Sequence, residues 1–331
     1  MKKIMNSAST YVDDVLAGLV LAHPRLALGG SANRVVHRAG GARKGKVGIT
    51  SGGGSGHLPL FTGYVGQGML DSCSIGNVFE GPNVESCIDA IKIADGGAGV
   101  LRLYGNYGGD RMNFDMAGEF LEGEIETTTV LGTDDVASAS PDEGKKRRGV
   151  AGIIYAYKIA GAKAEEGADL SAVTATAARA VAATKTIGLA LSPCQVPGSA
   201  KPTFEIAADE FELGMGIHGE PGLWRSKLKP ADEIVDDMLS RLLEERPAGH
   251  GGRVSVLVNS LGATPLEELL IMYRRVAAKL RETGIDIVQP LVGHYATSME
   301  MAGASISLCF LDEELEHLLS APSGSPFWEV K

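Results

Sequence analysis

Two histidines stand inside separate glycine-rich segments of this 331-residue chain. Residues 51–57 read SGGGSGH and end on His57, while residues 216–222 read GIHGEPG and contain His218. Glycine lets a backbone come close to a small ligand, and a neighbouring imidazole can then act on it. A core histidine would gain nothing from such a frame, because each glycine costs about 0.5–1 kcal/mol in ordering relative to alanine. We therefore expect both histidines to act on a ligand.

A third tight segment adds a carboxylate. Residues 105–110 read GNYGGD, starting at Gly105 and ending at Asp110. Two imidazoles, one carboxylate and a row of bare backbone N–H groups suit chemistry on a compact, polar molecule that carries a carbonyl group. Asp110 is also a good cap for a following helix, and capping is compatible with catalysis.

The composition argues against several classes of partner. With 44% hydrophobic and 22% charged residues, the chain reads as a soluble protein of about two domains. A net charge of −10 argues against nucleic acids and anionic membranes. No apolar run approaches the roughly 20 residues of a membrane span, and the N-terminus leads into no signal core, so we expect a cytoplasmic protein. The cysteines show no zinc or CxxC spacing and predict reduced thiols: Cys73, Cys87, Cys194 and Cys309.

Alternating strand and helix patterns predict an α/β fold. In the first half we expect strands at 46–50, 99–104 and 126–131, and helices at 59–69, 112–121, 150–166 and 170–184. In the second half we expect strands at 186–191, 253–260, 285–291 and 305–311, and helices at 230–244, 265–281 and 312–319.

The pattern restarts after Lys185, where several prolines mark a loop. We therefore predict two α/β domains, residues 1–185 with the glycine loops and residues 186–331 with His218. Each should hold a mixed or largely parallel sheet with flanking helices. Ligands of such sheets bind beyond the carboxyl ends of the strands, where the glycine loops fall.

Several other motifs fail on inspection. Residues 40–47 (GGARKGKV) resemble a P-loop, but the strand comes after them and Val47 replaces the required Ser or Thr. Residues 214–219 match GxGxxG, yet Glu-Pro-Gly follows where a helix should open, which argues against a dinucleotide site. No histidine spacing supports a metal site. The histidines without a glycine frame are interpreted as ordinary: His23, His37, His250, His294 and His317.

Two charged segments have simple interpretations. Asp134 and Asp135 follow the third expected strand and could bind magnesium, although a surface turn is the favoured interpretation. Residues 142–148 (DEGKKRR) read most simply as a solvated loop, because the surrounding charge is acidic.

Five segments together resemble the substrate-binding subunit of dihydroxyacetone kinases. The resemblance runs from about residue 10 to residue 325 and keeps the order of the motifs. They are GGGSGH (52–57), GNYxGD (105–110), GIHGEPG (216–222), VNSLGATP (258–265) and TSMEMAG (297–303). This resemblance implies two α/β domains, usually in a homodimer.

The resemblance also implies roles for individual residues. His218 would hold the ketone as a hemiaminal, while His57 and Asp110 would serve proton transfer and substrate binding. The remaining expected substrate contacts come from the glycine segments: Gly53, Gly54, Ser55, Gly56 and Gly105. A covalent bond makes chemical sense, because a triose has six heavy atoms and non-covalent contacts are capped near 9 kcal/mol, about 1.5 kcal/mol per atom. Only a ketone or aldehyde can accept the imidazole, so glycerol would be excluded.

The phosphoryl donor has no expected site in this chain, which lacks a P-loop and the protein-kinase motifs. The resemblance implies a separate all-helical subunit that carries ATP, or a tightly held ADP with magnesium. In the second arrangement a phosphotransferase-system protein recharges the ADP. We therefore expect no cofactor in this chain itself.

Departures from the family pattern bear on the substrate. Gly105 stands where the family often has a lysine that contacts substrate, and Leu58 replaces the usual glutamate before Pro59. The segments TDD (133–135) and RRGVAG (147–152) look closer to relatives that act on erythrulose or other short ketoses. The alternative functions are a ketose-sensing transcriptional co-activator without kinase activity and, more weakly, a metal-dependent aldolase or isomerase.

Overall fold

The computed structural model describes residues 2–250 and 252–331, which form two compact units. Unit 1 comprises residues 2–132, 156–179 and 317–331, and unit 2 comprises the described residues of 133–155 and 180–316. The chain thus passes between the units more than once. Whether it can be divided near residue 185 into separately folding domains stays a prediction.

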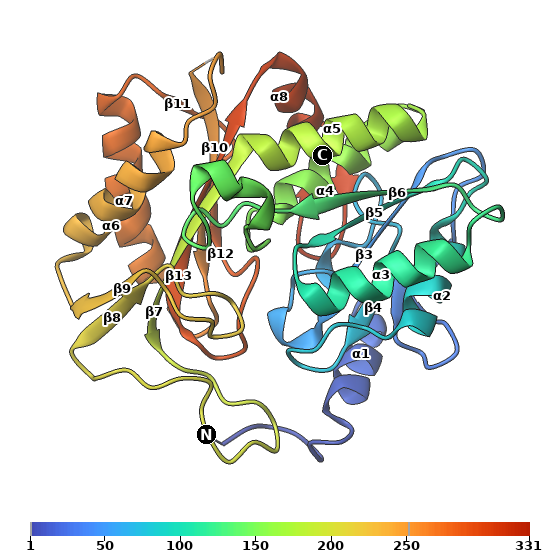
Figure 1. Ribbon diagram of the computed structural model, residues 1–331, viewed down its shortest axis with the longest axis horizontal. Coiled ribbons are helices and arrows are strands. Elements are labelled where there is room, and N and C mark those ends of the chain that lie inside the picture. Colours follow the sequence, from blue (N-terminus) through green and yellow to red (C-terminus); the bar gives the residue numbers. More distant parts are fainter. Residues whose placement is uncertain (1, 251) are drawn as a thin grey trace. The chain divides into compact units, whose positions relative to one another are not determined.

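Unit 1 contains a six-stranded mixed sheet in the order β1-β2-β4-β3-β5-β6. Its strands are β1 Leu26–Gly29, β2 Val35–Arg38, β3 Gly48–Gly54, β4 Ser72–Gly76, β5 Val100–Gly105 and β6 Thr127–Gly132. Strands β4, β3, β5 and β6 run parallel, and β1 and β2 extend the sheet in antiparallel pairing. Helix α2 (Val84–Ala94) connects β4 to β5, and α3 (Gly108–Phe120) connects β5 to β6 (Figure 1).

Strands β3, β4 and β5 are nearly all buried, as parallel strands covered by helices require, whereas the edge strand β6 is largely half-buried. The Asn83 side chain caps α2 by accepting a hydrogen bond from the backbone N–H of Ser86 at 2.8 Å. On α3 the buried Phe114 ring stacks on Tyr104 of β5, with 4.4 Å between the ring centres. These contacts fix the start of α3 against the carboxyl end of β5.

Unit 2 contains a seven-stranded, mostly antiparallel sheet, in which β12 also pairs with β10. Its main path is β11-β10-β13-β7-β8-β9. The strands are β7 Thr184–Ser192, β8 Glu210–Leu213, β9 Trp224–Lys227, β10 Arg253–Ser260, β11 Asp286–Ile287, β12 Leu291–Gly293 and β13 Ala302–Leu311. Both sheets are flanked by helices, which confirms the predicted α/β class.

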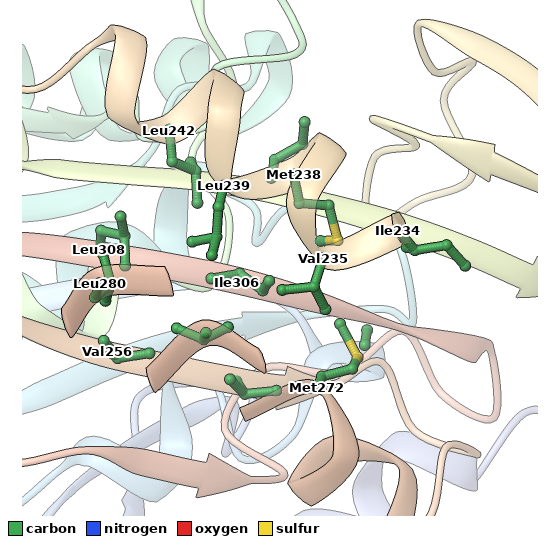
Figure 2. Close-up of a cluster of buried hydrophobic side chains, with 14 of the residues drawn as sticks. Ile234, Val235, Met238, Leu239, Leu242, Val256, Met272, Leu280, Ile306 and Leu308 are labelled. Atoms are coloured by element: carbon green, nitrogen blue, oxygen red, sulfur yellow. The ribbon is translucent and has the colours of Figure 1, made fainter. Parts of the chain in front are cut away.

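Helices α6 (Ala231–Glu244) and α7 (Leu266–Glu282) lie side by side on the sheet of unit 2 (Figure 1). Apolar residues of α6 at three- and four-residue spacing pack with β10, β13 and α7. Figure 2 shows this core: Ile234, Val235, Met238, Leu239 and Leu242 from α6, Val256, Ile306 and Leu308 from the strands, and Met272 and Leu280 from α7.

The remaining elements are short or lie outside the two sheets. The helices are α1 Tyr11–Ala22, α4 Ile153–Glu165, α5 Leu170–Ala183 and α8 Glu313–Ser320. The 3₁₀ turns are η1 Ser55–His57, η2 Thr62–Tyr64 and η3 Pro141–Lys146, and β14 Ser323–Gly324 pairs with β15 Glu329–Val330. In residues 2–250 and 252–331 no helix combines the length and apolar character that crossing a membrane requires.

Two sequence predictions of elements were wrong. Residues 59–69 contain only the turn η2 instead of a helix, because Phe61 and Gly68 both have φ of 68° and break helical geometry. The strand expected at 285–291 is divided into β11 and β12, with Gln289 at φ 47° between them. A residue in the left-handed region cannot continue an extended strand.

Candidate functional site

The first glycine segment is a strand rather than the expected loop, because β3 runs through Gly54. A Cβ atom at Gly52, Gly53 or Gly54 would lie 2.3 to 2.5 Å from a neighbouring atom. At Gly53 the neighbour is the ring of Phe61. The glycines therefore have a packing role, which the sequence argument about ligand access left out.

His57 lies immediately after this strand, as the last residue of η1, and is 1% exposed. Its ring centre lies 5.2 Å from that of Phe79, and Phe61 approaches it edge-on at 6.5 Å. The imidazole thus packs between two aromatic rings.

A neighbouring segment, residues 77–82, accepts hydrogen bonds from the backbone just before His57. The backbone N–H of Ser55 donates to the carbonyl of Asn77 at 3.0 Å, and that of Gly56 donates to Val78 at 2.7 Å. These two N–H groups are therefore engaged within the protein. The Ser55 hydroxyl is buried and has no hydrogen-bond partner among the residues that the structure describes, so it is the polar group here that a ligand can satisfy.

Asp110 occupies the first turn of α3 rather than the capping position before it. The N-cap residue is Tyr107, which makes no side-chain capping hydrogen bond. Asp110 is 8% exposed, and its carboxylate near the N-terminal end of the helix is favoured by the helix dipole. The capping explanation for this aspartate was therefore wrong, and a buried carboxylate remains to be explained.

Residues 77–82 also reach Asp110. A Cβ atom at Gly81 would lie 2.3 Å from Asp110 Oδ1, so only glycine lets this segment pass the carboxylate. The Asn113 side chain of α3 donates to the carbonyl of Pro82 at 2.7 Å and holds the segment there. Because Phe79 contacts His57 and Gly81 contacts Asp110, this one segment brings the surroundings of both residues together in unit 1. The sequence analysis missed it; its Gly81-Pro82 turn was the available signal.

Gly105 ends β5, where it pairs with Gly132 of β6 and is buried. Strands β3 and β5 are parallel neighbours, so their carboxyl ends lie at the same edge of the sheet. Gly54 and Gly105 therefore end adjacent strands, and the two glycine segments meet at one sheet edge. Open α/β sheets bind ligands beyond the carboxyl ends of their strands, which makes this edge a candidate ligand site.

His218 lies in a tight loop of unit 2 that follows β8. The backbone N–H of Gly216 donates to the carbonyl of Glu220 at 3.0 Å, and that of Gly219 donates to Gly216 at 3.1 Å. Gly214 and Gly219 have φ of 82° and 86°, which side chains other than glycine rarely adopt. These glycines are required by the turn itself.

Glu220 holds both the ring and the backbone of His218. Its Oε1 lies 2.9 Å from Nδ1 of the ring, and its Oε2 accepts the backbone N–H of His218 at 3.0 Å. Burial raises the pKa of Glu220, but the hydrogen bond and charge of His218, with the Arg148 charge, lower it to about 2. An ionised carboxylate can only accept, so Nδ1 of a neutral ring must donate and Nε2 carries the lone pair. In a ring with its proton on Nδ1, the Nε2 lone pair can act as a nucleophile.

Asp134 and Asp135 do not form the expected surface turn, because they are 2% and 3% exposed. Asp134 accepts the backbone N–H groups of Val150 and Gly152 at 3.0 and 2.8 Å. Burial raises the pKa of Asp135 to about 6, although the charge of Arg148 opposes the shift. In the described part of the chain, no group of three or more His, Cys, Asp or Glu side chains is arranged to hold a metal ion.

The charged segment 142–148 is solvated only in part. Turn η3 is exposed apart from Gly144, but Arg147 and Arg148 point inward, which corrects the prediction of a solvated loop. Arg147 pairs with Glu245 through two contacts, one of them 2.6 Å. Buried arginines need such partners, since an uncompensated charge in the interior is costly.

His57, Asp110 and the glycines at the ends of β3 and β5 thus belong to unit 1, and His218 belongs to unit 2. Within unit 1 the structure places the first group around one sheet edge and residues 77–82. Within unit 2 it gives His218 a charged partner. The four cysteines are free and buried.

Known proteins match almost the whole of this chain. A model of the Dak1 domain matches residues 17–327. The dihydroxyacetone-binding subunit DhaK of PTS-dependent dihydroxyacetone kinase 2 from Listeria innocua is 44% identical, with 100% of both chains covered. The D-erythrulose kinase of Mycolicibacterium smegmatis is 41% identical over 99% of this chain, which spans 57% of that protein.

Two solved structures also have a fold similar to that of this chain. The dihydroxyacetone kinase from C. freundii in complex with AMP-PNP and Mg2+ has a TM-score of 0.91 and 33% identity, over 99% of this chain and 61% of that one. The dihydroxyacetone kinase operon co-activator Dha-DhaQ has a TM-score of 0.89 and 31% identity, over 96% and 98% of the two chains.

Proposed function

This chain belongs to the Dak1 domain family, and from that premise we propose that it is the substrate-binding subunit of a kinase for dihydroxyacetone or a related short ketose such as erythrulose. The relatives that it matches from end to end are named dihydroxyacetone-binding subunits. The observation that carries the proposal is the pairing of His218 Nδ1 with the ionised Glu220, because it leaves Nε2 as the nucleophile.

The covalent step needs only this chain and the ketose. The Nε2 lone pair of His218 forms a bond to the carbonyl carbon, and the π electrons of the C=O bond move onto oxygen. That oxygen takes up one proton from solvent, and Nδ1 releases one proton to solvent by way of Glu220, which stays ionised. The product is a neutral hemiaminal, and the protons taken up equal those released.

For the residues of unit 1 we propose proton transfer and substrate recognition. Asp110 would accept the proton of the terminal hydroxyl as that oxygen attacks the phosphoryl group. His57 would hydrogen-bond the substrate from its aromatic enclosure. The glycine segments would supply the other contacts: Gly53, Gly54, Ser55, Gly56 and Gly105. Among these, the Ser55 hydroxyl is supported by its buried position without a partner in the described residues.

The phosphoryl donor would reside on a separate helical subunit that carries ATP, or ADP with magnesium recharged by a phosphotransferase-system protein. The relatives named PTS-dependent kinases support such a division of labour. The greater length of the erythrulose kinases, of which this chain spans 56–58%, leaves room for the donor part in one polypeptide. We keep the homodimer and the cytoplasmic location as predictions; size-exclusion chromatography tests the dimer.

The surface of α3 supports a place where that subunit would dock. Met112, Met116 and Phe120 are 60%, 41% and 69% exposed and repeat every four residues, so they form one apolar stripe on α3. The same helix carries Asp110 in its first turn. A donor subunit that covers the stripe would lie on the helix that carries the proposed base, and exposed apolar patches of this kind mark interaction surfaces. Exposed Asp115 and Glu119 border the stripe and favour a partner with a basic rim.

The alternative function, a ketose-sensing transcriptional co-activator, is favoured by the likeness to the co-activator Dha-DhaQ. An assay separates the two. The purified chain is mixed with ATP, a candidate nucleotide subunit and a panel of ketoses that includes dihydroxyacetone and both erythrulose enantiomers. The kinase proposal expects a phosphorylated ketose only when both proteins are present. Adduct formation on His218 without any phosphorylated product, with every candidate donor system, would support the co-activator instead.

A further inference from the structure

Arg148 connects the His218 loop to a second carboxylate within unit 2. Its Nε donates to Asp135 Oδ2 at 2.9 Å, and its Nη2 lies 2.8 Å from the same oxygen. Nη2 also donates to the carbonyl of Gly214 at 3.0 Å, two residues before the first glycine of the GIHGEPG motif. Its Nη1 lies 3.9 Å from Oε2 of Glu220. One guanidinium thus contacts the backbone entering the loop and faces the carboxylate that holds the histidine.

This arginine is itself held in place. Its side chain is 14% exposed and that of Asp135 is 4% exposed. Asp135 Oδ1 accepts the backbone N–H of Ala137 at 3.1 Å, and the backbone N–H of Arg148 donates to the Ser138 hydroxyl at 3.0 Å. A backbone hydrogen bond from Asp135 to Arg148 at 3.1 Å closes the arrangement. The planar guanidinium therefore has little freedom to turn away from Glu220.

Gly216 shows how closely the two side chains meet. A Cβ atom there would lie 2.1 Å from Glu220 Oε2 and 2.5 Å from Arg148 Nη1. Glycine is needed at this position because the carboxylate and the guanidinium come together over its backbone. The first glycine of the motif is thus explained by Arg148 and Glu220 and not by turn geometry alone.

Building on the proposed function, we propose that Arg148, held by Asp135, is a positioning residue for His218. Glu220 presents Oε1 to the ring and Oε2 to the backbone of the loop, and the positive charge 3.9 Å from Oε2 favours the carboxylate in that orientation. An ionised and fixed Glu220 selects the ring form with the proton on Nδ1. Without Arg148 the carboxylate can rotate, the ring can adopt either neutral form, and a smaller share of molecules presents the Nε2 lone pair to a ketone.

The test compares Arg148→Met with Arg147→Met. The adjacent Arg147 pairs with Glu245 and serves as a matched control of the same type and segment. Nitrogen NMR of the labelled protein without ketose measures the proton position on the His218 ring, and mass spectrometry with dihydroxyacetone measures adduct affinity. In Arg148→Met we expect a mixture of ring forms and about tenfold weaker adduct formation, by analogy with the loss of outer partners of metal-binding histidines. Arg147→Met should lower stability, because it leaves Glu245 without its arginine, but it should change affinity less than about twofold.

Two further variants keep the test decisive. Asp135→Asn retains the volume of the side chain and should reproduce the mixed ring signal if Arg148→Met fails to fold. Arg148→Lys keeps a positive charge without the planar fork and should restore part of the affinity. If both Arg148→Met and Asp135→Asn keep the proton on Nδ1 and the wild-type affinity, the positioning role is refuted. If the wild-type protein forms no adduct at all, the proposed function fails, and the ring signal still decides the role of Arg148.

Discussion

Both histidine segments are rich in glycine, but the glycines have different structural roles in the two segments. In unit 1 the glycines let β3 pack against an aromatic ring and carbonyl oxygens, and His57 is 1% exposed between aromatic rings. In unit 2 the glycines allow a tight turn, and the side chain of His218 is 22% exposed beside a carboxylate. A fixed anion beside an imidazole selects the nitrogen that carries the proton. The surroundings of the two histidines therefore differ, as do the roles that we propose for them: proton transfer for His57 and nucleophilic attack for His218.

The largest expected difference is in covalent binding. His218→Ala should abolish the adduct and weaken ketose binding on the order of 100-fold or more, because six heavy atoms offer little non-covalent affinity. His57→Ala should keep the adduct. Mass spectrometry with dihydroxyacetone and erythrulose measures both, and glycerol serves as a ligand that cannot form the bond. Equal adduct formation in wild type and His218→Ala would assign the nucleophile to another residue.

A second difference lies between binding and turnover. Asp110→Asn should keep the adduct but lower phosphoryl transfer with the partner subunit by at least about tenfold, or 1.4 kcal/mol, because the nearly isosteric amide cannot accept the proton. Glu85→Gln is the matched control, since Glu85 is an exposed acidic residue in the first turn of α2. Turnover above a tenth of the wild-type rate would show that Asp110 is not the base.

Replacing one glycine of each histidine segment with alanine tests whether the glycines have different roles. Gly53→Ala would place a Cβ atom 2.3 Å from the Phe61 ring, so we expect a loss of about 1–3 kcal/mol in the free energy of unfolding. Gly216→Ala would separate Glu220 from Arg148, so we expect weaker adduct formation with a smaller stability loss. Denaturant unfolding and adduct mass spectrometry give both values for each variant. The reverse pattern would mean that the glycines of unit 2 serve packing and those of unit 1 serve the ligand.

Much of the fold could be predicted because its elements are long and regular. The amphipathic α6 and α7 and the apolar strands β10 and β13 carry strong local periodicity, and they were placed within a few residues. The prediction missed two helices, α1 and α2, and five strands of four or five residues, β1, β2, β4, β8 and β9. Short strands are specified by pairing with distant segments, so a local pattern cannot reveal them.

The site shows the same limit. Local glycine motifs pointed to His57, Asp110 and His218, whose geometry the structure supplies. Phe79 and Arg148 were missed because their contacts connect residues far apart in the sequence, 72 positions in the case of Arg148 and Glu220. The buried state of Asp135 was missed for the same reason, since a pair of aspartates after a strand is more often a surface turn. Local motifs therefore pointed to the proposed reacting groups, whereas the residues that contact them are found only from the tertiary structure.

The apolar stripe on α3 gives a prediction about the partner. Phe120→Glu should lower coupled turnover by about tenfold, because a buried charge in an interface lacks compensation, while adduct formation on the isolated chain stays unchanged. Leu270→Glu on α7 is the control, since Leu270 is also exposed, at 49%. If Phe120→Glu changes the oligomeric state of the isolated chain instead, a second copy and not the donor subunit covers this stripe.

The smallest expected effect concerns a buried cation of unit 1, which contrasts with the paired Arg148 of unit 2. Lys158 is fully buried on α4, and its Nζ donates to the carbonyl of Leu318 at 2.7 Å. A carbonyl is neutral, so it satisfies the hydrogen bond without balancing the charge. Burial accordingly lowers the pKa of Lys158 from 10.5 to about 8.

The sign of the resulting pH dependence follows from proton uptake. Between pH 8 and 10.5 the unfolded chain keeps the Lys158 proton that the folded chain has released, so the free energy of unfolding rises with pH. From pH 7 to pH 9 the wild type should therefore gain about 1.4 kcal/mol relative to Lys158→Met, which lacks the group. Denaturant unfolding of both proteins at the two pH values measures this change, and the difference removes the contribution of other titrating groups.

The control Lys92→Met replaces a lysine that is 46% exposed, and its stability difference from wild type should stay constant. A constant difference for Lys158→Met as well would mean that the folded chain keeps Lys158 charged at pH 9, and that unit 1 compensates its buried cation as fully as unit 2 does.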